Sequence, residues 1–187
     1  MKEKYNQIWE LALPYLKAGV MKDFVLHTKG VISAMEIILQ NEKSDENILI
    51  PAAILHDTGW SRVPAYLQRS KEPADKRKAM ELHLEYAAPI ISVVLTKLNY
   101  TPNQIQRIIE IVKAHKFQDP TELDKQLLID ADSTADAFKD QFYSDVKSYG
   151  TTPLQAYEYR KQNKFYTTSA TKLFANELEN RRKEFQN

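Results

Sequence analysis

The 187-residue sequence contains no cysteine, only four glycines and no long apolar run. Without cysteine the chain forms no disulfide bond and offers no thiolate, so any metal site must use imidazole and carboxylate ligands. The low glycine content, set against many Leu, Ile, Ala, Lys and Glu residues, favours helices over sheets. The sequence also lacks the glycine-rich loop with which many proteins bind phosphate groups.

An excess of charge of one sign is lacking as well, because 26 Lys and Arg residues are balanced by 25 Asp and Glu residues. A formal net charge of +1 predicts no broad attraction to nucleic acid or to an anionic membrane. No apolar stretch approaches the roughly 20 residues that a membrane-spanning helix needs. The first residues do not form a signal peptide, so we expect a cytoplasmic protein.

The apolar residues indicate the fold class. They make up 43% of the chain, which is typical of one soluble domain with its own core. They recur at helical spacing through most of the sequence, which predicts an all-α bundle of roughly seven to nine helices. Asp23 and Thr101 are typical helix starts. Residues 59–73 have no clear period, and we expect them to be irregular.

The expected boundaries follow from these starts and from the breaks between them. One helix runs from Asp23 to near Gln40, and the longest runs from about Asp75 to Leu98. Two further helices are predicted near 153–162 and 168–185, in a C-terminal section (150–187) that packs on a core of about 22–140. No linker or low-complexity segment marks a second domain, so residues 1–187 are treated as one domain.

One apolar run ends abruptly in two polar residues. Residues 50–55 lead into His56 and Asp57, and Gly59 is expected to stop the helix there. An ionised aspartate at the end of a buried helix is costly unless a positive group meets it. A divalent cation is such a group, and histidine is its commonest protein ligand. Alone, an adjacent His-Asp pair is more often a surface or capping pair, so the other histidines decide its meaning.

Only four histidines are present, and each falls on the apolar face or at the buried end of a different predicted helix. They are His27, His56, His83 and His115. A single inward histidine is usually a core residue with its own hydrogen-bond partner. Four of them are satisfied together if they converge on a metal ion. Among the nearby carboxylates, Asp132 has apolar neighbours one turn away, which makes it a better inward candidate than Asp130.

Part of this arrangement resembles a known family. His27, the pair His56-Asp57 and Asp132 resemble the signature of the HD superfamily of metal-dependent phosphohydrolases. The resemblance covers roughly residues 22–140. It implies an HD-domain-like helical bundle in which these four side chains hold a divalent metal ion.

The resemblance also implies roles for further residues. His83 and His115 match the two extra histidines of HD proteins that hold a second ion, and Asp57 then bridges both ions. Asp57, His83 and His115 are therefore the residues expected to take part in catalysis. The segment 130–132 and the C-terminal tail are similar to those of small stand-alone bacterial HD hydrolases, in which the second aspartate is the ligand.

The expected ligands favour certain metals and a certain chemistry. A site rich in imidazole suits Mn, Fe, Co, Ni or Zn better than Mg or Ca, and one or two ions are expected. A metal ion lowers the pKa of a water molecule that it binds, which supplies a nucleophile near neutral pH. Arg62 and Arg77, in a locally basic stretch, are expected to bind the phosphate group of the substrate.

Three functions remain open at this point. We favour a phosphohydrolase, either a phosphomonoesterase or a phosphodiesterase, that attacks a nucleotide or another small phosphorylated molecule with metal-activated water. The second is an HD-type diiron oxygenase that cleaves a C–C or C–P bond, because some HD proteins carry iron on the same six ligands. The third is a non-catalytic metal-binding regulatory domain, which the basic loop and the lack of a closed cysteine-type site disfavour.

Overall fold

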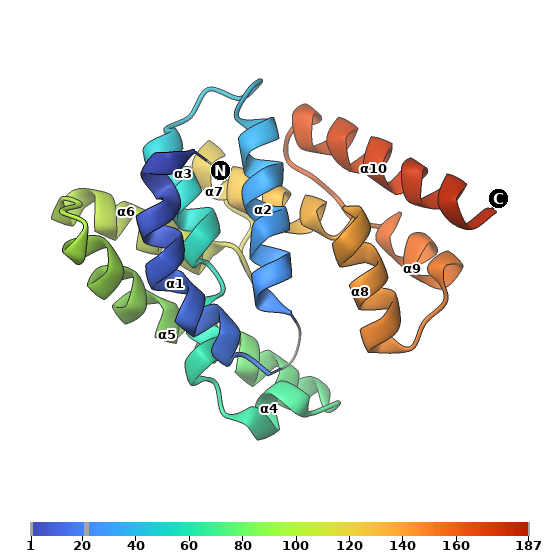
Figure 1. The fold of residues 1–187 in the computed structure, drawn as a ribbon, viewed down its shortest axis with the longest axis horizontal. Coiled ribbons are helices and arrows are strands. Elements are labelled where there is room, and N and C mark those ends of the chain that lie inside the picture. The colour runs from blue at the N-terminus through green and yellow to red at the C-terminus, as the bar shows by residue number, and fades with distance from the viewer. Residues whose placement is uncertain (1, 21–22, 187) are drawn as a thin grey trace.

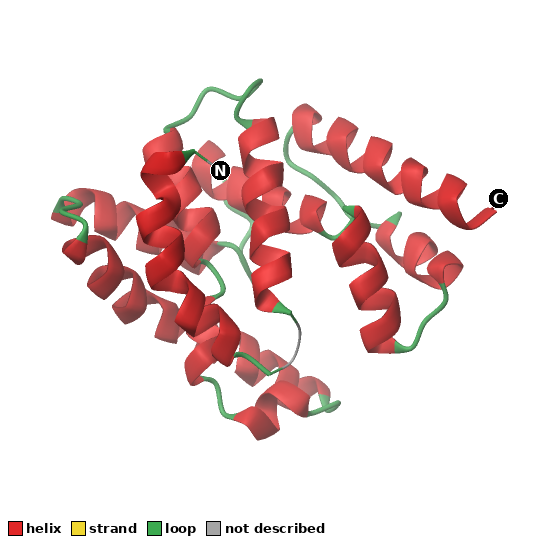
Figure 2. Ribbon diagram, viewed as in Figure 1, coloured by secondary structure: helices red, strands yellow, loops and turns green. Residues whose placement is uncertain are grey.

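The computed structural model describes residues 2–20 and 23–186. Over these residues the chain has ten α-helices, two short 3-10 helices and no strand, which confirms the all-α class. Figure 2 shows the same result as helices joined by loops and turns. The number of helices is slightly above the roughly seven to nine that the periodicity predicts.

The elements follow one another in a simple order, shown in Figure 1. They are η1 (Glu3–Tyr5), α1 (Asn6–Ala18), α2 (Phe24–Ile38), α3 (Glu46–Leu55), η2 (Thr58–Arg62), α4 (Ala65–Arg69), α5 (Pro73–Lys97), α6 (Pro102–Ala114), α7 (Leu123–Ala135), α8 (Lys139–Tyr149), α9 (Pro153–Arg160) and α10 (Thr168–Gln186).

Helix α3 is the most deeply buried element of the bundle. Every residue from Ile48 to Leu55 is buried, so this helix is apolar on all sides, as expected for a central helix. Helices α1, α2, α6 and α7 surround it, while α2 also packs along α7. The consequence is that the polar residues directly after α3 are delivered into the interior and not to the surface.

The predicted helix starts are confirmed. The Asp23 side chain accepts a hydrogen bond from the Leu26 amide at 2.9 Å, which caps α2. Thr101 and Gln104 form a reciprocal capping box at the start of α6. The two C-terminal helices, α9 and α10, lie close to their predicted ranges.

One prediction about an irregular segment is wrong, and one helix was not predicted. Residues 59–73 contain most of η2 and all of α4, which are too short to show a period in the sequence. Helix α8 was not expected at all. Its buried face carries Gln141 and Asp145 beside Phe142, so the sequence shows no apolar stripe that would indicate a helix here. The helix ends at Gly150, whose φ of 63° lies in the left-handed region that glycine adopts readily.

The C-terminal helices contain a small apolar cluster of their own, apart from the main core. It consists of Ala137, Phe142, Ala156, Phe174 and Leu178. Helix α10 also packs on α7 and α2, so these helices lie directly against the bundle. Figure 1 shows α8, α9 and α10 together on one side of α2.

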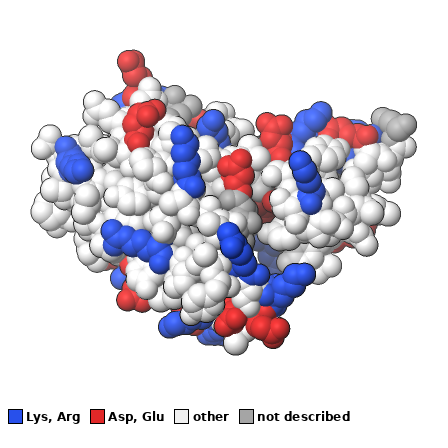
Figure 3. Space-filling model, turned by 60° about the horizontal axis from the view of Figure 1, so that its bottom comes forward, with Lys and Arg blue, Asp and Glu red and all other residues white. Residues whose placement is uncertain are grey.

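The surface drawn in Figure 3 carries Lys and Arg side chains interspersed with Asp and Glu. The mixture follows from the near-equal numbers of the two kinds of charge. No described helix combines the length and the apolarity needed to span a bilayer.

Candidate metal centre

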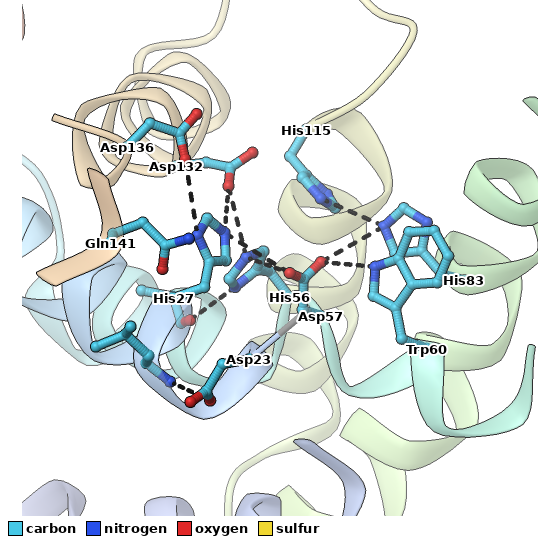
Figure 4. A network of polar contacts seen from close by, with 12 residues as sticks. Asp23, His27, His56, Asp57, Trp60, His83, His115, Asp132, Asp136 and Gln141 are labelled. Carbon is cyan, nitrogen blue, oxygen red and sulfur yellow. Dashed lines mark hydrogen bonds and ion pairs between the residues drawn. The ribbon is translucent and has the colours of Figure 1, made fainter. Parts of the chain in front are cut away.

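The structure brings the six predicted metal ligands together in the interior. They come from different places on the bundle: His27 from α2, His56 and Asp57 from the end of α3, His83 from α5, His115 from the end of α6 and Asp132 from α7. None of the six side chains is more than 9% exposed. Figure 4 shows Asp57 between the rings of His56 and His83.

Two overlapping groups of three residues have the geometry of metal sites. His27, His56 and Asp57 form the first group, and Asp57, His83 and His115 form the second. In each group the candidate ligand atoms lie within 4.8 Å of one another. Asp57 belongs to both, and its two carboxylate oxygens face different groups. Its Oδ2 lies 3.3 Å from His56 Nε2, whereas its Oδ1 lies 3.8 Å from His83 Nε2.

Asp132 adds a second carboxylate to the first group. Its Oδ1 lies 2.9 Å from His27 Nε2 and 3.7 Å from His56 Nε2. Two ligand atoms that are each about 2.1 Å from one ion, at an angle of about 90–110°, lie roughly 3.0–3.4 Å apart. The spacings in the cluster are close to this range, so the residues fit a metal ion without large rearrangement.

Two of the histidines are held in a defined tautomer by the helices that carry them. His56 Nδ1 donates to the Ala53 carbonyl at 2.9 Å, and His115 Nδ1 donates to the Val112 carbonyl. Carbonyls in the last turn of a helix are free to accept such bonds. Because a carbonyl only accepts, Nδ1 must carry the proton, and Nε2 presents a lone pair to the cluster.

When the His56 ring is neutral, this tautomer points the lone pair of its Nε2 atom at other hydrogen-bond acceptors. His56 Nε2 is buried and has no hydrogen-bond partner among the described residues. Its neighbours are the carboxylate oxygens of Asp57 and Asp132, which are acceptors too. Buried polar atoms are normally paired, and a cation is the species that satisfies several lone pairs at once. The cluster therefore fits metal binding.

The pKa values of the histidines differ within the cluster. Burial lowers the pKa of His83 to about 4, and it lowers the pKa of His115 well below its ordinary value, with Lys116 acting in the same direction. Burial also lowers the pKa of His56, but the Asp57 and Asp132 carboxylates together outweigh it and raise the net pKa, so without a metal ion a proton on Nε2 offsets the two carboxylates. His83 and His115 are therefore neutral at pH 7, which is the form that binds metal.

Trp60 supports the shared aspartate. Its indole Nε1 donates to Asp57 Oδ1 at 3.1 Å, and its ring stacks on His83 with centroids 4.6 Å apart. No role was predicted for Trp60 from the sequence. The signal that could have indicated one is its spacing from Asp57: residues three apart in a 3-10 helix lie on the same side, and Asp57 directly precedes η2.

Gly59 is needed for a reason other than the one expected. We expected it to stop a helix. Its actual constraint is space, because a Cβ at this position would lie 1.9 Å from the His83 carbonyl oxygen and 2.7 Å from the Ala87 amide nitrogen. The absence of a side chain lets η2 lie directly on α5, and this contact brings Asp57 next to His83.

Lys116 is a second residue that the sequence analysis missed. Its ammonium bonds Asp132 Oδ2, while its side chain is 34% exposed. Burial raises the pKa of Asp132, but Lys116 and His27 outweigh it and hold that pKa well below its usual value. Burial lowers the pKa of Lys116, but Asp132 outweighs it and the pKa is raised. Both groups are therefore charged at pH 7.

Asp130 is also buried, although its neighbours in the sequence made it the poorer inward candidate. It faces away from the cluster and accepts hydrogen bonds from the Tyr166 amide and from the amide and hydroxyl of Thr167. These groups directly precede α10. Burial is the largest influence on Asp130 and raises its pKa. Helix α7 is covered on both sides, so residues on opposite faces are both buried.

The two predicted substrate-binding arginines lie at the surface. Arg62 is exposed at the end of η2. Arg77 bonds Glu81 at 3.1 Å and lies over the ring of Phe117, 5.4 Å from its centroid. Arg77 is thus close to the turn that follows His115. Substrate binding by either arginine stays a prediction.

Comparison with known proteins assigns the segment that carries this site to a family. The family model described as the HD domain matches residues 24–139, which is more than half of the chain. The matched segment starts with α2, ends at the first residue of α8 and contains all six residues of the cluster. The resemblance drawn from the sequence is therefore confirmed. None of the curated proteins and none of the solved structures compared with the chain matches it.

Proposed function

The chain belongs to the HD domain family, and from this premise we propose that it is a metal-dependent phosphohydrolase acting on a small phosphate ester, with a nucleotide as the favoured substrate. HD domain proteins are mostly metal-dependent phosphohydrolases. The observation that carries the proposal is the buried His56 Nε2, whose lone pair faces carboxylate oxygens and has no protein donor among the described residues.

We assign the six cluster residues to two metal positions. His27, His56, Asp57 and Asp132 hold the first ion, and Asp57, His83 and His115 hold the second. The shared role of Asp57 is supported by its two oxygens, one toward each group. Mn, Fe, Co, Ni or Zn suits this mixture of imidazole and carboxylate.

The chemistry depends on what the protein does around the ions. A divalent ion held by these residues would lower the pKa of a bound water molecule, which would supply the nucleophile for attack on phosphorus. Trp60 orients the Asp57 carboxylate through its indole N–H, and the helix carbonyls orient the rings of His56 and His115. Burial excludes bulk water, so charge interactions with the phosphoryl group are strong.

The direct test is a screen for phosphate release. Nucleotides and phosphomonoesters are incubated with the purified protein, loaded in turn with Mn²⁺, Fe²⁺, Co²⁺, Ni²⁺ or Zn²⁺, and with EDTA as the control. We expect inorganic phosphate from at least one substrate with one of these ions, and none with EDTA. No phosphate with any ion, together with oxygen uptake by the iron-loaded protein, would instead assign the chain to the diiron oxygenases.

A further inference from the structure

Lys116 lies at the boundary between the buried cluster and solvent. Its ammonium bonds Asp132 Oδ2 inside the cluster, yet its side chain is 34% exposed, whereas the six candidate ligands are 9% exposed or less. From this position we propose that Lys116 is the anion-binding residue of the site and takes a phosphoryl oxygen of the substrate. The inference rests on the proposed phosphohydrolase function and names a residue that the comparisons do not assign.

The backbone directs Lys116 toward the cluster. His115 is the C-cap of α6, and the bond from its Nδ1 to the Val112 carbonyl fixes the ring in the last turn. Lys116 follows directly, and Phe117 then takes a left-handed φ of 59° that turns the chain away. A non-glycine residue rarely adopts this conformation, so the corner at residues 115–117 has a defined shape.

The charges explain why an anion is the expected partner. In the protein alone, Lys116 offsets part of the negative charge of Asp57 and Asp132. One divalent ion cancels the charge of these two carboxylates, and a second ion makes the site net positive, so the ammonium no longer faces a net negative charge. A phosphoryl group is then the favourable partner, because an ammonium binds phosphate oxygens as a point charge with three donors.

A second cation lies near the same corner. The Arg77 guanidinium packs over the ring of Phe117, which directly follows Lys116. Arg77 is mostly exposed and is held by Glu81 on its own helix. This arrangement adds positive charge outside the site and leaves direct contact with the reacting phosphoryl group to Lys116.

A purely structural role for Lys116 makes different predictions. If the lysine only neutralises Asp132, its removal should strengthen metal binding and leave anion binding unchanged. If it binds the substrate, its removal should also weaken binding of inorganic phosphate to the metal-loaded protein. Phosphate affinity therefore separates the two roles without any measurement of activity, and metal affinity shows that each variant is still loaded.

The experiment uses Lys116→Met, which keeps the length of the side chain, and Lys116→Arg, which keeps the charge. Lys113→Met is the matched control, because Lys113 is an exposed lysine one turn earlier on α6. Each protein is checked for folding by circular dichroism. Its Co²⁺ affinity is measured by competition with a chelator, and phosphate is then titrated into the loaded protein by calorimetry.

We expect Lys116→Met to bind Co²⁺ at least as tightly as the wild type and to bind phosphate roughly tenfold more weakly or worse. Lys116→Arg should keep most of the phosphate affinity, and Lys113→Met should match the wild type. Unchanged phosphate affinity in Lys116→Met overturns the inference and leaves the hydrolase proposal standing. A loaded wild type that binds no phosphate overturns it as well.

The two proposals can fail separately. Phosphate binding that depends on Lys116, in a protein that releases no phosphate from any ester, would support the anion site and refute the hydrolase. Hydrolysis that is equally fast in the wild type and in Lys116→Met would do the reverse.

Discussion

Two regions of this molecule bury charged groups, and they do so in opposite ways. Among the C-terminal helices, Arg160 Nη2 bonds Asp145 Oδ2 at 2.6 Å, and the Asp145 Oδ1 accepts from Gln141 at 2.7 Å. Arg160 also donates to the Asp136 carbonyl. In the cluster, by contrast, the lone pair of His56 Nε2 faces carboxylates and meets no donor in the described part of the chain.

The difference separates a structural network from a ligand site. A buried charge that the protein's own donors satisfy needs no ligand, and removal of one partner destabilises the fold. A buried surplus of acceptors needs a cation from outside. The boundary of the family match agrees with this division, because it ends at residue 139, before Gln141, Asp145 and Arg160.

The largest expected effect is the loss of the metal centre in Asp57→Ala. Because Asp57 belongs to both candidate groups, this variant should lose metal binding and activity altogether. His83→Ala and His115→Ala should lose only the second ion. Metal content of the purified proteins, measured by mass spectrometry, is the check, and an Asp57→Ala protein that keeps both ions refutes the shared role.

The next effect is on stability and concerns the C-terminal network. Arg160→Met leaves Asp145 buried without its cation, which should lower the free energy of unfolding by about 3–5 kcal/mol. The metal affinity of the folded protein should not change. Urea unfolding gives the measurement. Lys161→Met, which breaks an exposed pair with Glu158, is the control and should cost less than about 1 kcal/mol.

A smaller effect is expected from Trp60→Phe, which keeps a ring against His83 but removes the hydrogen bond to Asp57. Loss of a group that orients a metal ligand typically lowers metal affinity by about 10–100-fold. Chelator competition measures this change. Trp9→Phe serves as the control, since Trp9 packs on the core away from the cluster. Equal losses in both variants would mean that the tryptophan matters only for packing.

The last expected effect is a gradual pH dependence of stability that belongs to the cluster. The pKa of His83 is about 4 in the folded protein against 6.5 as the ordinary value. The unfolded chain therefore takes up a proton first, and stability falls as the pH drops from 6.5 towards 4. The raised pKa of His56 acts in the opposite direction but at higher pH, because its stabilising contribution is gained above 6.5 and is complete below that value.

We expect His83 to contribute a decrease of roughly 3 kcal/mol across this window in the metal-free protein. Urea unfolding with EDTA at several pH values is the measurement. His83→Asn should reduce the slope and leave the part due to His115, whose pKa is also lowered, whereas Arg160→Met should keep the whole slope, because all four histidines lie in the cluster. An unchanged slope in His83→Asn would show that other groups cause it.

Much of the centre could be predicted from the sequence because the helical period is local. The apolar positions around His27 and His83 define which face of each helix is buried, and no other part of the chain is needed for that inference. The caps at Asp23 and Thr101 are local as well, because each involves residues only three positions apart. These predictions are confirmed.

The errors arise where burial is decided by neighbours far along the chain. Asp130 is buried because residues 166–167 cap it from across the fold, and α8 buries polar residues because Arg160 pairs with them. Neither partner is visible in a local pattern. In a local sequence pattern, a buried polar residue looks the same as an exposed one when its partner lies many residues away.

The sequence by itself determined the all-α class, the buried faces of the helices and the four inward histidines, since helical periodicity and capping depend on residues a few positions apart. Only the tertiary structure decided that the two oxygens of Asp57 face different groups and that Trp60 and Lys116 contact the site. It also decided that Gly59 allows α5 to pack closely against η2. These contacts depend on how separate helices pack, and packing is set by side chains distant in the chain.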